Sequence, residues 1–298
     1  MLNINQTEST NNVVIAGVLK ELEVEEKSTA DKRDYVSCKA IIKVDQEIGG
    51  TMYENEIPVR MFSMKLKKDG SPSKIYKSIV EYRDKFTSLG ACPEDQPELA
   101  SKVMITSGSL EENIWVGSDG TPRSSFQIST NFMNSPRGEF KQGATFELSG
   151  VVLGKTREVN SNDEETGRLK VKFGIVRYGG RVDVLDLIAV NENAVNFIEA
   201  NWEEGDTVNL NGAVSINQST KTWYEEQGFG EPIMRTKTET RRELIILGGS
   251  PSGLEEDYSY DADAIKKGLA DRQTRVDEMK NKASGSKSHA PKNNGFGF

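Results

Sequence analysis

The chain carries AGVLKELEVEE at residues 16–26 and a similar stretch, SGVVLGKTREV, at residues 149–159. A second pair of stretches matches in the same way: KVMITSGSLEENIW at residues 102–115 and DTVNLNGAVSINQSTKTW at residues 206–223. All four contain the β-branched and other apolar residues that favour strands, and each passes through a glycine. Because the order is the same in both halves, the chain is expected to repeat one small β structure. Chance similarity between two β-rich halves is the alternative.

The remaining predicted elements also follow one order in the two halves. Apolar and alternating segments indicate strands in the first half from residue 13 and over 35–44, 57–62, 103–105 and 126–128. In the second half they indicate strands from residue 146 and over 169–178, 182–189, 208–210 and 244–247. The second half is shorter between its helix and its fourth strand, as expected if a loop was lost after duplication.

One helix is predicted in the same place of each half. Apolar residues recur at helical spacing over residues 72–89 and again over 193–202. Ser71 is the expected N-cap of the first helix, and Asn191 or Asn193 that of the second. The order strand, strand, strand, helix, strand, strand is that of the OB-fold, a five-stranded Greek-key barrel with its helix between strands 3 and 4. We therefore predict a mainly β protein with two tandem OB-fold barrels.

Length and composition agree with two modest domains followed by a tail. The 298 residues are about twice the roughly 150 residues that a domain commonly has. We predict OB-fold domain 1 at residues 1–138, OB-fold domain 2 at residues 139–253, and a charged, flexible and largely disordered C-terminal tail at residues 254–298. Within that tail, residues 262–282 form a short charged stretch that has the composition of a helix.

The sequence has neither the apolar run of about 18 residues that a membrane span requires nor a visible secretory signal. We expect a cytoplasmic protein, in a bacterial cell or in the cytoplasm of a phage-infected host, without a membrane partner.

Residues that usually support catalysis or metal binding are scarce. Cys38 lies in a predicted strand, Cys92 in a loop and His289 in the tail, so no disulfide framework and no zinc site can be assembled from them. Asp and Glu are numerous but scattered, with no convergent pair for acid–base chemistry. We therefore expect no enzyme, no catalytic residues, no metal and no cofactor. A carboxylate-dependent nuclease is the enzymatic alternative.

Over residues 13–250 the chain resembles tandem OB-fold single-stranded DNA-binding proteins of the bacterial and bacteriophage replication type. The four stretches quoted above carry the resemblance at the level of pattern, and no short motif among them is diagnostic alone. The resemblance implies sequence-tolerant binding that protects unpaired DNA in replication, recombination or repair. RNA binding is a close alternative. A β-rich protein-interaction or virion-type protein without nucleic-acid binding is the rival from another class.

Strands 2 and 3 of this fold bind nucleic acid on their outward face. Alternation leaves cations and aromatic rings on that face in both halves: Tyr35, Lys39, Lys43, Arg60 and Phe62 in the first, and Lys170, Lys172 and Tyr178 in the second. Cations attract phosphates and flat rings stack on bases, as single-strand binding requires. The alternative is an ordinary solvated face of a half-buried sheet.

The segments between strands 4 and 5 combine tryptophan, turn residues and cations. The first contains Trp115 and Arg123, and the second contains Trp223, Tyr224, Arg235 and Lys237 and continues to Arg241 and Arg242. Of these residues, we predict that Trp115, Arg123, Trp223, Tyr224, Arg235 and Lys237 contact nucleic acid. In the structural alternative, the two tryptophans plug the ends of the barrels.

Net charge opposes this hypothesis. Lys and Arg number 38 against 46 Asp and Glu, giving −8 and a pI of about 5.1. Summed charge says little about a local groove, but it argues against tight nonspecific binding of duplex DNA. Acidic runs at residues 21–26 and 163–165 lie in the first loop of each half, which borders the binding groove in this fold, so they are the weakest point of the hypothesis.

The chain ends in an apolar tip that includes Phe296 and Phe298. The resemblance implies that such a tip recruits replication or recombination proteins. The acids expected beside it are missing, and Lys287 and Lys292 occur instead.

Overall fold

The computed structural model describes residues 1–298 except 4–6, 161, 228, 230 and 287–298. The described residues are mainly β, as predicted. The first five strands are β1 Asn11–Ser28, β2 Asp34–Ile48, β3 Thr51–Met64, β4 Lys102–Val116 and β5 Pro122–Thr130. The next five are β6 Gly143–Val159, β7 Glu165–Arg177, β8 Arg181–Ala189, β9 Thr207–Glu225 and β10 Ile233–Gly249. The α-helices are α1 Lys74–Lys85, α2 Glu192–Asn201 and α3 Ala262–Ser286, with short 3-10 turns η1 Leu89–Ala91, η2 Pro97–Leu99, η3 Tyr178–Gly180 and η4 Glu256–Tyr258.

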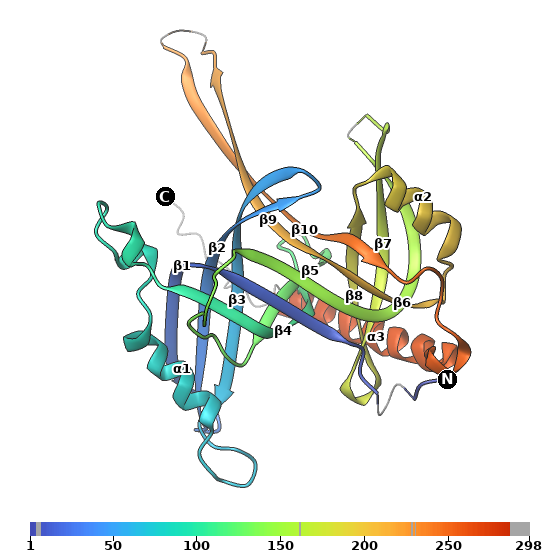
Figure 1. The fold of residues 1–298 in the computed structure, drawn as a ribbon, viewed down its shortest axis with the longest axis horizontal. Coiled ribbons are helices and arrows are strands. Elements are labelled where there is room, and N and C mark those ends of the chain that lie inside the picture. Colours follow the sequence, from blue (N-terminus) through green and yellow to red (C-terminus); the bar gives the residue numbers. More distant parts are fainter. Residues whose placement is uncertain (4–6, 161, 228, 230, 287–298) are drawn as a thin grey trace, which may run out of the picture.

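The strands pair into two closed sets that share one sheet (Figure 1). The first ring, β1–β5, runs β2-β3-β5-β4-β1 and closes by pairing β1 with β2; the second ring, β6–β10, runs β6-β7-β8-β10-β9 and closes by pairing β9 with β6. In each ring the contact of the third strand with the fifth is parallel and the other pairings are antiparallel. Antiparallel pairing of β1 with β6, from Asn11 opposite Leu148 to Ala16 opposite Gly143, joins the rings.

Strand alternation places the core where the sequence predicted it. Every second residue of β2 from Val36 to Val44 is buried, as are Ile57, Val59 and Met61 of β3. Leu169, Val171, Phe173 and Ile175 of β7 are buried in the same way. Helix α1 contributes Ile79 and Tyr82 to this core, and α2 contributes Val195 and Ile198.

Helix α1 is shorter than predicted, and its cap is a different residue. It begins at Lys74 rather than at residue 72, because Pro72 forms a bridge with Leu66 and Ser73 remains extended. The Ser73 hydroxyl, not that of Ser71, accepts a hydrogen bond from the Tyr76 N–H. In α2 the cap is Asn191, one of the two candidates, whose side chain accepts from the Asn193 N–H. Both helices therefore start with a side chain that satisfies a free backbone donor.

The glycines that mark the repeat are places where two backbones approach closely. A Cβ atom on Gly17 would lie 2.3 Å from the Lys43 carbonyl oxygen, and one on Gly150 would lie 2.3 Å from the Gly174 carbonyl oxygen. The pairing register shifts just beyond each glycine, between Leu19 and Glu21 in β1 and between Val152 and Gly154 in β6. The two rings thus share a bend at equivalent positions, where the first strand crosses the second.

The C-terminal segment differs from the expectation of a largely disordered tail. Residues 262–286 form α3, which lies along the second ring (Figure 1). Ile265 packs into a cluster with Val151, Val176 and Val182, and the Arg272 guanidinium binds the buried carboxylate of Glu112 on β4. The helix has an apolar face formed by residues 265, 269 and 276, which the overall charged composition of this segment does not reveal. Residues 287–298, with Lys287, His289, Lys292, Phe296 and Phe298, lie outside the described residues.

Gly138 and residue 253, the predicted domain limits, fall in the connections after β5 and β10. The limits themselves stay predictions, because β1–β6 pairing runs across the first of them. No helix within the described ranges is long and apolar enough to cross a membrane.

We predict that Gly17→Ala and Gly150→Ala each destabilise the protein by about 1–3 kcal/mol, because the new methyl group overlaps a backbone oxygen that cannot move freely. Gly143→Ala in β6 is the matched control, since a Cβ there meets no atom within 4 Å. Chemical denaturation of the three variants measures the effect. Equal unfolding midpoints for all three would contradict the close approach.

Candidate nucleic-acid interface

The outward face of β2 and β3 gathers five predicted residues: Tyr35, Lys39, Lys43, Arg60 and Phe62. Lys39 lies opposite Arg60, and Ser37 lies opposite Phe62. The rings of Tyr35 and Phe62 are 5.3 Å apart between centroids, and Phe62 is 56% exposed. An aromatic pair and three cations therefore share one patch of the first ring.

Acidic neighbours neutralise part of this patch. The Lys39 ammonium is 3.1 Å from the Glu23 carboxylate, and that of Lys43 is 3.4 Å from Glu54. Among the residues that the structure describes, no carboxylate lies within 4.0 Å of the Arg60 guanidinium. Arg60 is thus the cation of this patch whose positive charge is available to bind an external anion.

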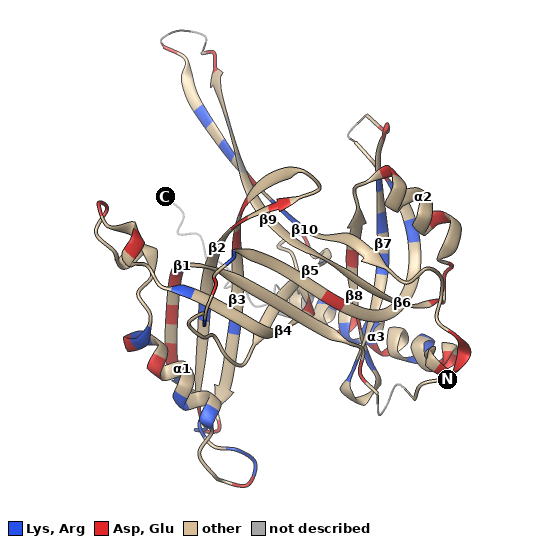
Figure 2. Ribbon diagram, in the orientation of Figure 1, with Lys and Arg blue, Asp and Glu red and all other residues tan. Residues whose placement is uncertain are grey.

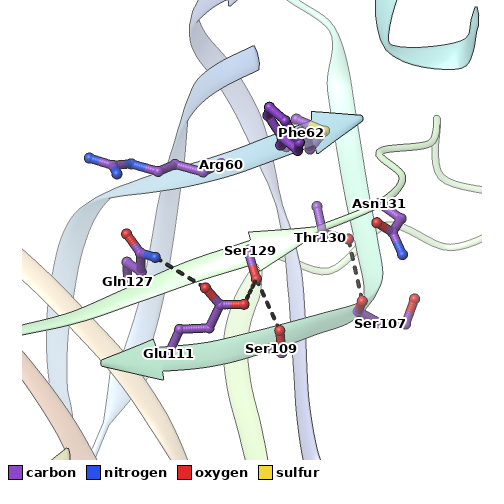
Figure 3. Close-up of a pocket in the computed structure, with 10 residues that line it drawn as sticks. Arg60, Phe62, Ser107, Ser109, Glu111, Gln127, Ser129, Thr130 and Asn131 are labelled. Carbon is purple, nitrogen blue, oxygen red and sulfur yellow. Dashed lines mark hydrogen bonds between the residues drawn. The ribbon is translucent and has the colours of Figure 1, made fainter. Parts of the chain in front are cut away.

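A cavity of about 450 Å³ opens beside Arg60 and Phe62 (Figure 3). Figure 3 shows these two residues on β3 at one side and hydrogen-bonded polar groups of β4 and β5 at the other. The Glu111 carboxylate accepts hydrogen bonds from the Ser129 hydroxyl at 2.7 Å, the Gln127 amide at 3.1 Å and, from the second ring, the Arg177 guanidinium at 3.2 Å. The cavity is therefore polar, with one aromatic wall and a single acid whose charge is compensated.

The corresponding face of the second ring has cations without aromatic partners. Lys170 and Lys172 lie exposed on β7, and the Lys170 ammonium is 3.5 Å from Asp186. Tyr178 is 79% exposed, but it starts the turn η3 at the opposite end of β7 from Lys170. At about 3.3 Å per residue, these two side chains are roughly 25 Å apart. The structure does not bring Tyr178 together with the two lysines.

Two further cations near β7, Lys155 and Arg157, were not predicted as site residues. Both line a cavity of about 560 Å³ with Lys170 and Lys172. The Lys155 ammonium donates to carbonyl oxygens of Ile198, Glu199 and Trp202 at the end of α2, where a cation stabilises the helix dipole. Arg157 pairs with Glu199. Their first role is therefore structural.

Trp115 and Trp223 occupy equivalent places in the two rings, each opposite an arginine. Trp115 on β4 pairs across the ladder with Arg123 on β5, and Trp223 on β9 pairs with Arg235 on β10. The tryptophans are 39% and 46% exposed, so they do not plug the barrel ends. In the second ring Trp202 is the buried tryptophan: it is 1% exposed and donates its indole N–H to the Ser250 carbonyl.

Each of these arginines is held by an acid of its own hairpin. The Arg123 guanidinium is 2.9 Å from the Asp119 carboxylate, and that of Arg235 is 2.6 Å from Glu225. Exposed ion pairs of this kind contribute little stability. The acid therefore orients the arginine, and the arginine can still leave it to bind another anion. The same three groups, tryptophan, arginine and acid, recur in both hairpins.

The outer part of β9 and β10 forms a ribbon that projects from the body, and we call residues 217–225 and 233–241 the arm (Figure 1). Its two faces differ, because side chains alternate along each strand. Trp223, Arg235 and Lys237 share one face together with the acids Glu225 and Glu239, and Figure 2 shows basic positions in blue along the ribbon of the arm. Tyr224, 69% exposed, lies on the other face opposite Met234. The structure thus separates Tyr224 from the other predicted residues of the arm.

The acids of β1, named above as the weak point, are largely engaged within the first ring. Hydrogen bonds from the Tyr76 hydroxyl and then from Arg83 lower the pKa of Glu26. The same contact with Glu26 raises the pKa of Tyr76 to about 12. Glu25 pairs with Lys27, which lowers the pKa of Glu25. Glu23 lies beside Lys39 and does weaken the positive potential of the β2–β3 face.

Sequence comparison and structure comparison give different kinds of similarity. The sequence model of the family described as YorF matches residues 9–282. No curated protein sequence is detectably similar to the chain. The solved structure of a deletion mutant of the single-stranded DNA binding protein from Thermus aquaticus is similar with a TM-score of 0.50 and 14% identity, covering 86% of this chain and 98% of that one. The wild-type protein from that organism gives a TM-score of 0.49 at 14% identity, covering 86% and 99%. At this identity the likeness concerns the fold alone.

We predict that Trp115 and Trp223 account for the quencher-accessible fluorescence of the three tryptophans. In the double variant Trp115→Phe/Trp223→Phe, the remaining emission from Trp202 should be blue-shifted and nearly insensitive to iodide. A Trp202→Phe variant should keep the accessible component. Strong iodide quenching in the double variant would show that Trp202 is not buried as described.

Proposed function

The chain belongs to the YorF family, and we propose that it is a sequence-tolerant single-stranded DNA-binding protein whose two strand rings are tandem OB-fold barrels. In each ring the helix follows the third strand in the chain, and the fourth and fifth strands form the hairpin with the tryptophan. This order is that of the OB-fold, in which the second and third strands and the neighbouring loops form the binding surface.

The observation that carries the proposal is the duplicated tryptophan–arginine pair. A single exposed apolar residue is ordinary on a protein surface, but here a half-exposed tryptophan opposite an arginine occurs twice at equivalent positions. Trp115 and Trp223 each offer a ring for stacking on a base, and Arg123 and Arg235 beside them can reach the adjoining phosphates. One such pair could be accidental, but its recurrence favours a shared ligand.

The first ring adds a second stacking surface. Tyr35 and Phe62 lie together beside Arg60, whose charge is not neutralised by any acid in the described part of the chain. A stacked base contributes about 1–3 kcal/mol, so three or four rings give useful affinity even for an acidic protein. Because stacking depends on the face of a base rather than its edge, this arrangement tolerates any sequence.

The biological role that we propose is protection of unpaired DNA during replication, recombination or repair in the cytoplasm of a bacterium or a phage-infected host. The protein acts by binding and not by catalysis. In this proposal Phe296 and Phe298, outside the described residues, recruit replication or recombination partners. RNA is the neighbouring substrate, since none of the groups named here distinguishes a 2′-hydroxyl.

A protein-interaction module without nucleic-acid binding is the second candidate. Many cations of the candidate surfaces are paired with carboxylates, which favours this second candidate because paired cations attract phosphates less strongly. These cations are Lys39, Lys43, Lys170, Arg123 and Arg235. The exposed tryptophans serve equally as anchors in a protein interface. Binding experiments separate the two candidates.

We predict that the protein binds oligo-dT of about 30–40 nucleotides in preference to duplex DNA of the same length, with quenching of tryptophan emission. The logarithm of affinity should fall with the logarithm of salt concentration, with a slope of about −0.7 per neutralised phosphate. Fluorescence titration at two salt concentrations measures both. Failure to bind oligo-dT at low salt would exclude the proposed function and favour the protein-interaction candidate.

We predict that Trp115→Ala and Trp223→Ala each weaken binding of oligo-dT by about 5- to 150-fold, the range that corresponds to one stacked base. Tyr258→Ala, which removes an exposed aromatic ring in η4, is the control and should leave affinity unchanged. Fluorescence anisotropy with labelled oligo-dT gives the dissociation constants. Wild-type affinity in both tryptophan variants would contradict the role of the repeated pair.

A further inference from the structure

A cavity of about 470 Å³ lies where the two rings meet, and nothing described so far uses it. Ser124 and Phe126 of β5 line it from the first ring, and Lys172 and Arg242 from the second. Helix α3 closes one side through Leu269 and Arg272. The cavity therefore exists because the rings are joined, and neither ring forms it alone.

Arg242 is held in a defined position in this cavity by contacts with the first ring. Its guanidinium lies over the Phe126 ring, 5.2 Å from the centroid, and its Nη2 donates to the Phe126 carbonyl oxygen at 3.1 Å. Both contacts come from β5, although Arg242 belongs to β10. A guanidinium fixed at two points retains several free donors in a planar arrangement that suits phosphate.

The charge of Arg242 is not compensated by the protein. No carboxylate within the described ranges lies within 4.0 Å of it, whereas its neighbour Arg241 contacts Glu243 at 2.8 Å and Glu158 at 3.7 Å. Removal from solvent, and then the nearby charge of Arg60, lower the pKa of Arg242. Arg60 lines the cavity beside Phe62 and Arg242 lines the junction cavity, so an anion close to both is attracted by two positive charges that otherwise repel each other.

The other charges around the cavity leave a positive balance. Arg272 is neutralised by Glu112, with 2.7 Å between Nε and the carboxylate. Asp186 pairs with Lys170, and Lys172 has no carboxylate within 4.0 Å in the described part of the chain. Arg242 and Lys172 therefore remain available to an anion, and the Ser124 side chain adds a hydroxyl to the lining.

This cavity connects the candidate surfaces of the two rings. Phe126 lines it and the adjacent Gln127 lines the cavity beside Arg60 and Phe62. On the other side, it shares Leu153, Lys172 and Asp186 with the cavity beside Lys170. The junction cavity and the cavity beside Lys170 therefore adjoin, whereas the junction cavity and the cavity beside Arg60 are lined by successive residues of β5, whose side chains point to opposite faces of the strand.

We propose that Arg242, assisted by Lys172, binds backbone phosphates of single-stranded DNA at the junction, so that one strand passes directly from the β2–β3 face of the first ring to the β7 face of the second. This inference rests on the proposed function and adds the route of the strand. The junction converts two separate binding faces into one longer site, in which binding to the first ring raises the effective concentration at the second.

The experiment measures the affinity of the full chain for oligo-dT from about 5 to about 35 nucleotides, because one OB-fold covers about 4–16 nucleotides. The wild-type affinity should rise steeply once the oligonucleotide spans both rings. Arg242→Gln should lower affinity for the longest oligonucleotides at least about tenfold and leave the shortest nearly unchanged, since linked sites gain up to 10²–10⁴ in avidity. Arg241→Gln is the matched control, because its guanidinium is already paired with acids.

Several outcomes overturn the inference and leave the proposed function standing. The first is an affinity of the wild-type chain that does not rise with oligonucleotide length, and the second is an equal effect of the two arginine variants. The third is tight binding of dTMP that Arg242→Gln abolishes, because this result would assign the cavity to a free nucleotide. Absence of any oligo-dT binding would instead reject the proposed function. Lys172→Gln provides a second test should Arg242→Gln lower the unfolding midpoint, and it should show the same loss confined to long oligonucleotides.

Discussion

Antiparallel pairing of β1 with β6 is the interaction on which the arrangement of the whole molecule depends. The first part of β1, residues 11–16, pairs with β6 on one side and β4 on the other, and its later part pairs with β2. Each of these two strands thus pairs with strands of its own ring and also with one strand of the other ring. Because hydrogen bonds and side-chain alternation set the register of such a pair, the two rings cannot slide or rotate independently.

Buried amides fix the contact between the rings still further. The Gln46 side chain donates to the Val214 carbonyl at 2.7 Å and accepts from the Ala144 N–H at 2.8 Å. The side-chain Oδ1 of Asn55 accepts a hydrogen bond from the Ile216 N–H at 2.8 Å. A buried amide without partners costs about 1–3 kcal/mol, so these bonds penalise any other placement of β9 against β3. The same placement carries Arg242 to Phe126 and forms the cavity at the junction.

Cations and acids alternate closely over the surface of this protein, and this explains how a chain of net charge −8 can still present positive sites. Most cations of the candidate faces have an acidic partner within 4.0 Å, which orients them and lowers the nonspecific attraction for polyanions. Arg60, Arg242 and Lys172 differ, since no acid in the described residues neutralises them. Arg242 and Lys172 line the cavity at the junction and Arg60 lines the cavity beside Phe62, whereas the paired cations are distributed over both rings and the arm.

Local periodicity in the sequence was sufficient to predict the strands, both helices between the third and fourth strands, and the buried face of β2, β3 and β7. These features depend on alternation and capping within a few residues, as in residues 36–44. The outward positions of Lys39, Arg60 and Phe62 followed from the same alternation. The exposure of Trp115 and Trp223 did not, because a tryptophan beside a turn has the same local pattern whether it plugs a barrel or faces solvent.

By itself, the sequence determined the repeated order of elements, because steric and hydrogen-bonding preferences act between near neighbours in the chain, whereas the close approach of Gly17 to Lys43 and of Gly150 to Gly174 joins residues of different strands. Tertiary structure alone decided that α3 packs against the body, through Ile265 and Arg272, and that Arg242 meets Phe126. Each of these depends on contacts between residues distant in sequence, and the contacts of Arg272 with Glu112 and of Arg242 with Phe126 join the two rings that β1 and β6 pair together. Composition and periodicity do not report which residues far apart in the sequence come into contact. For this reason the junction between the rings could not be predicted from them.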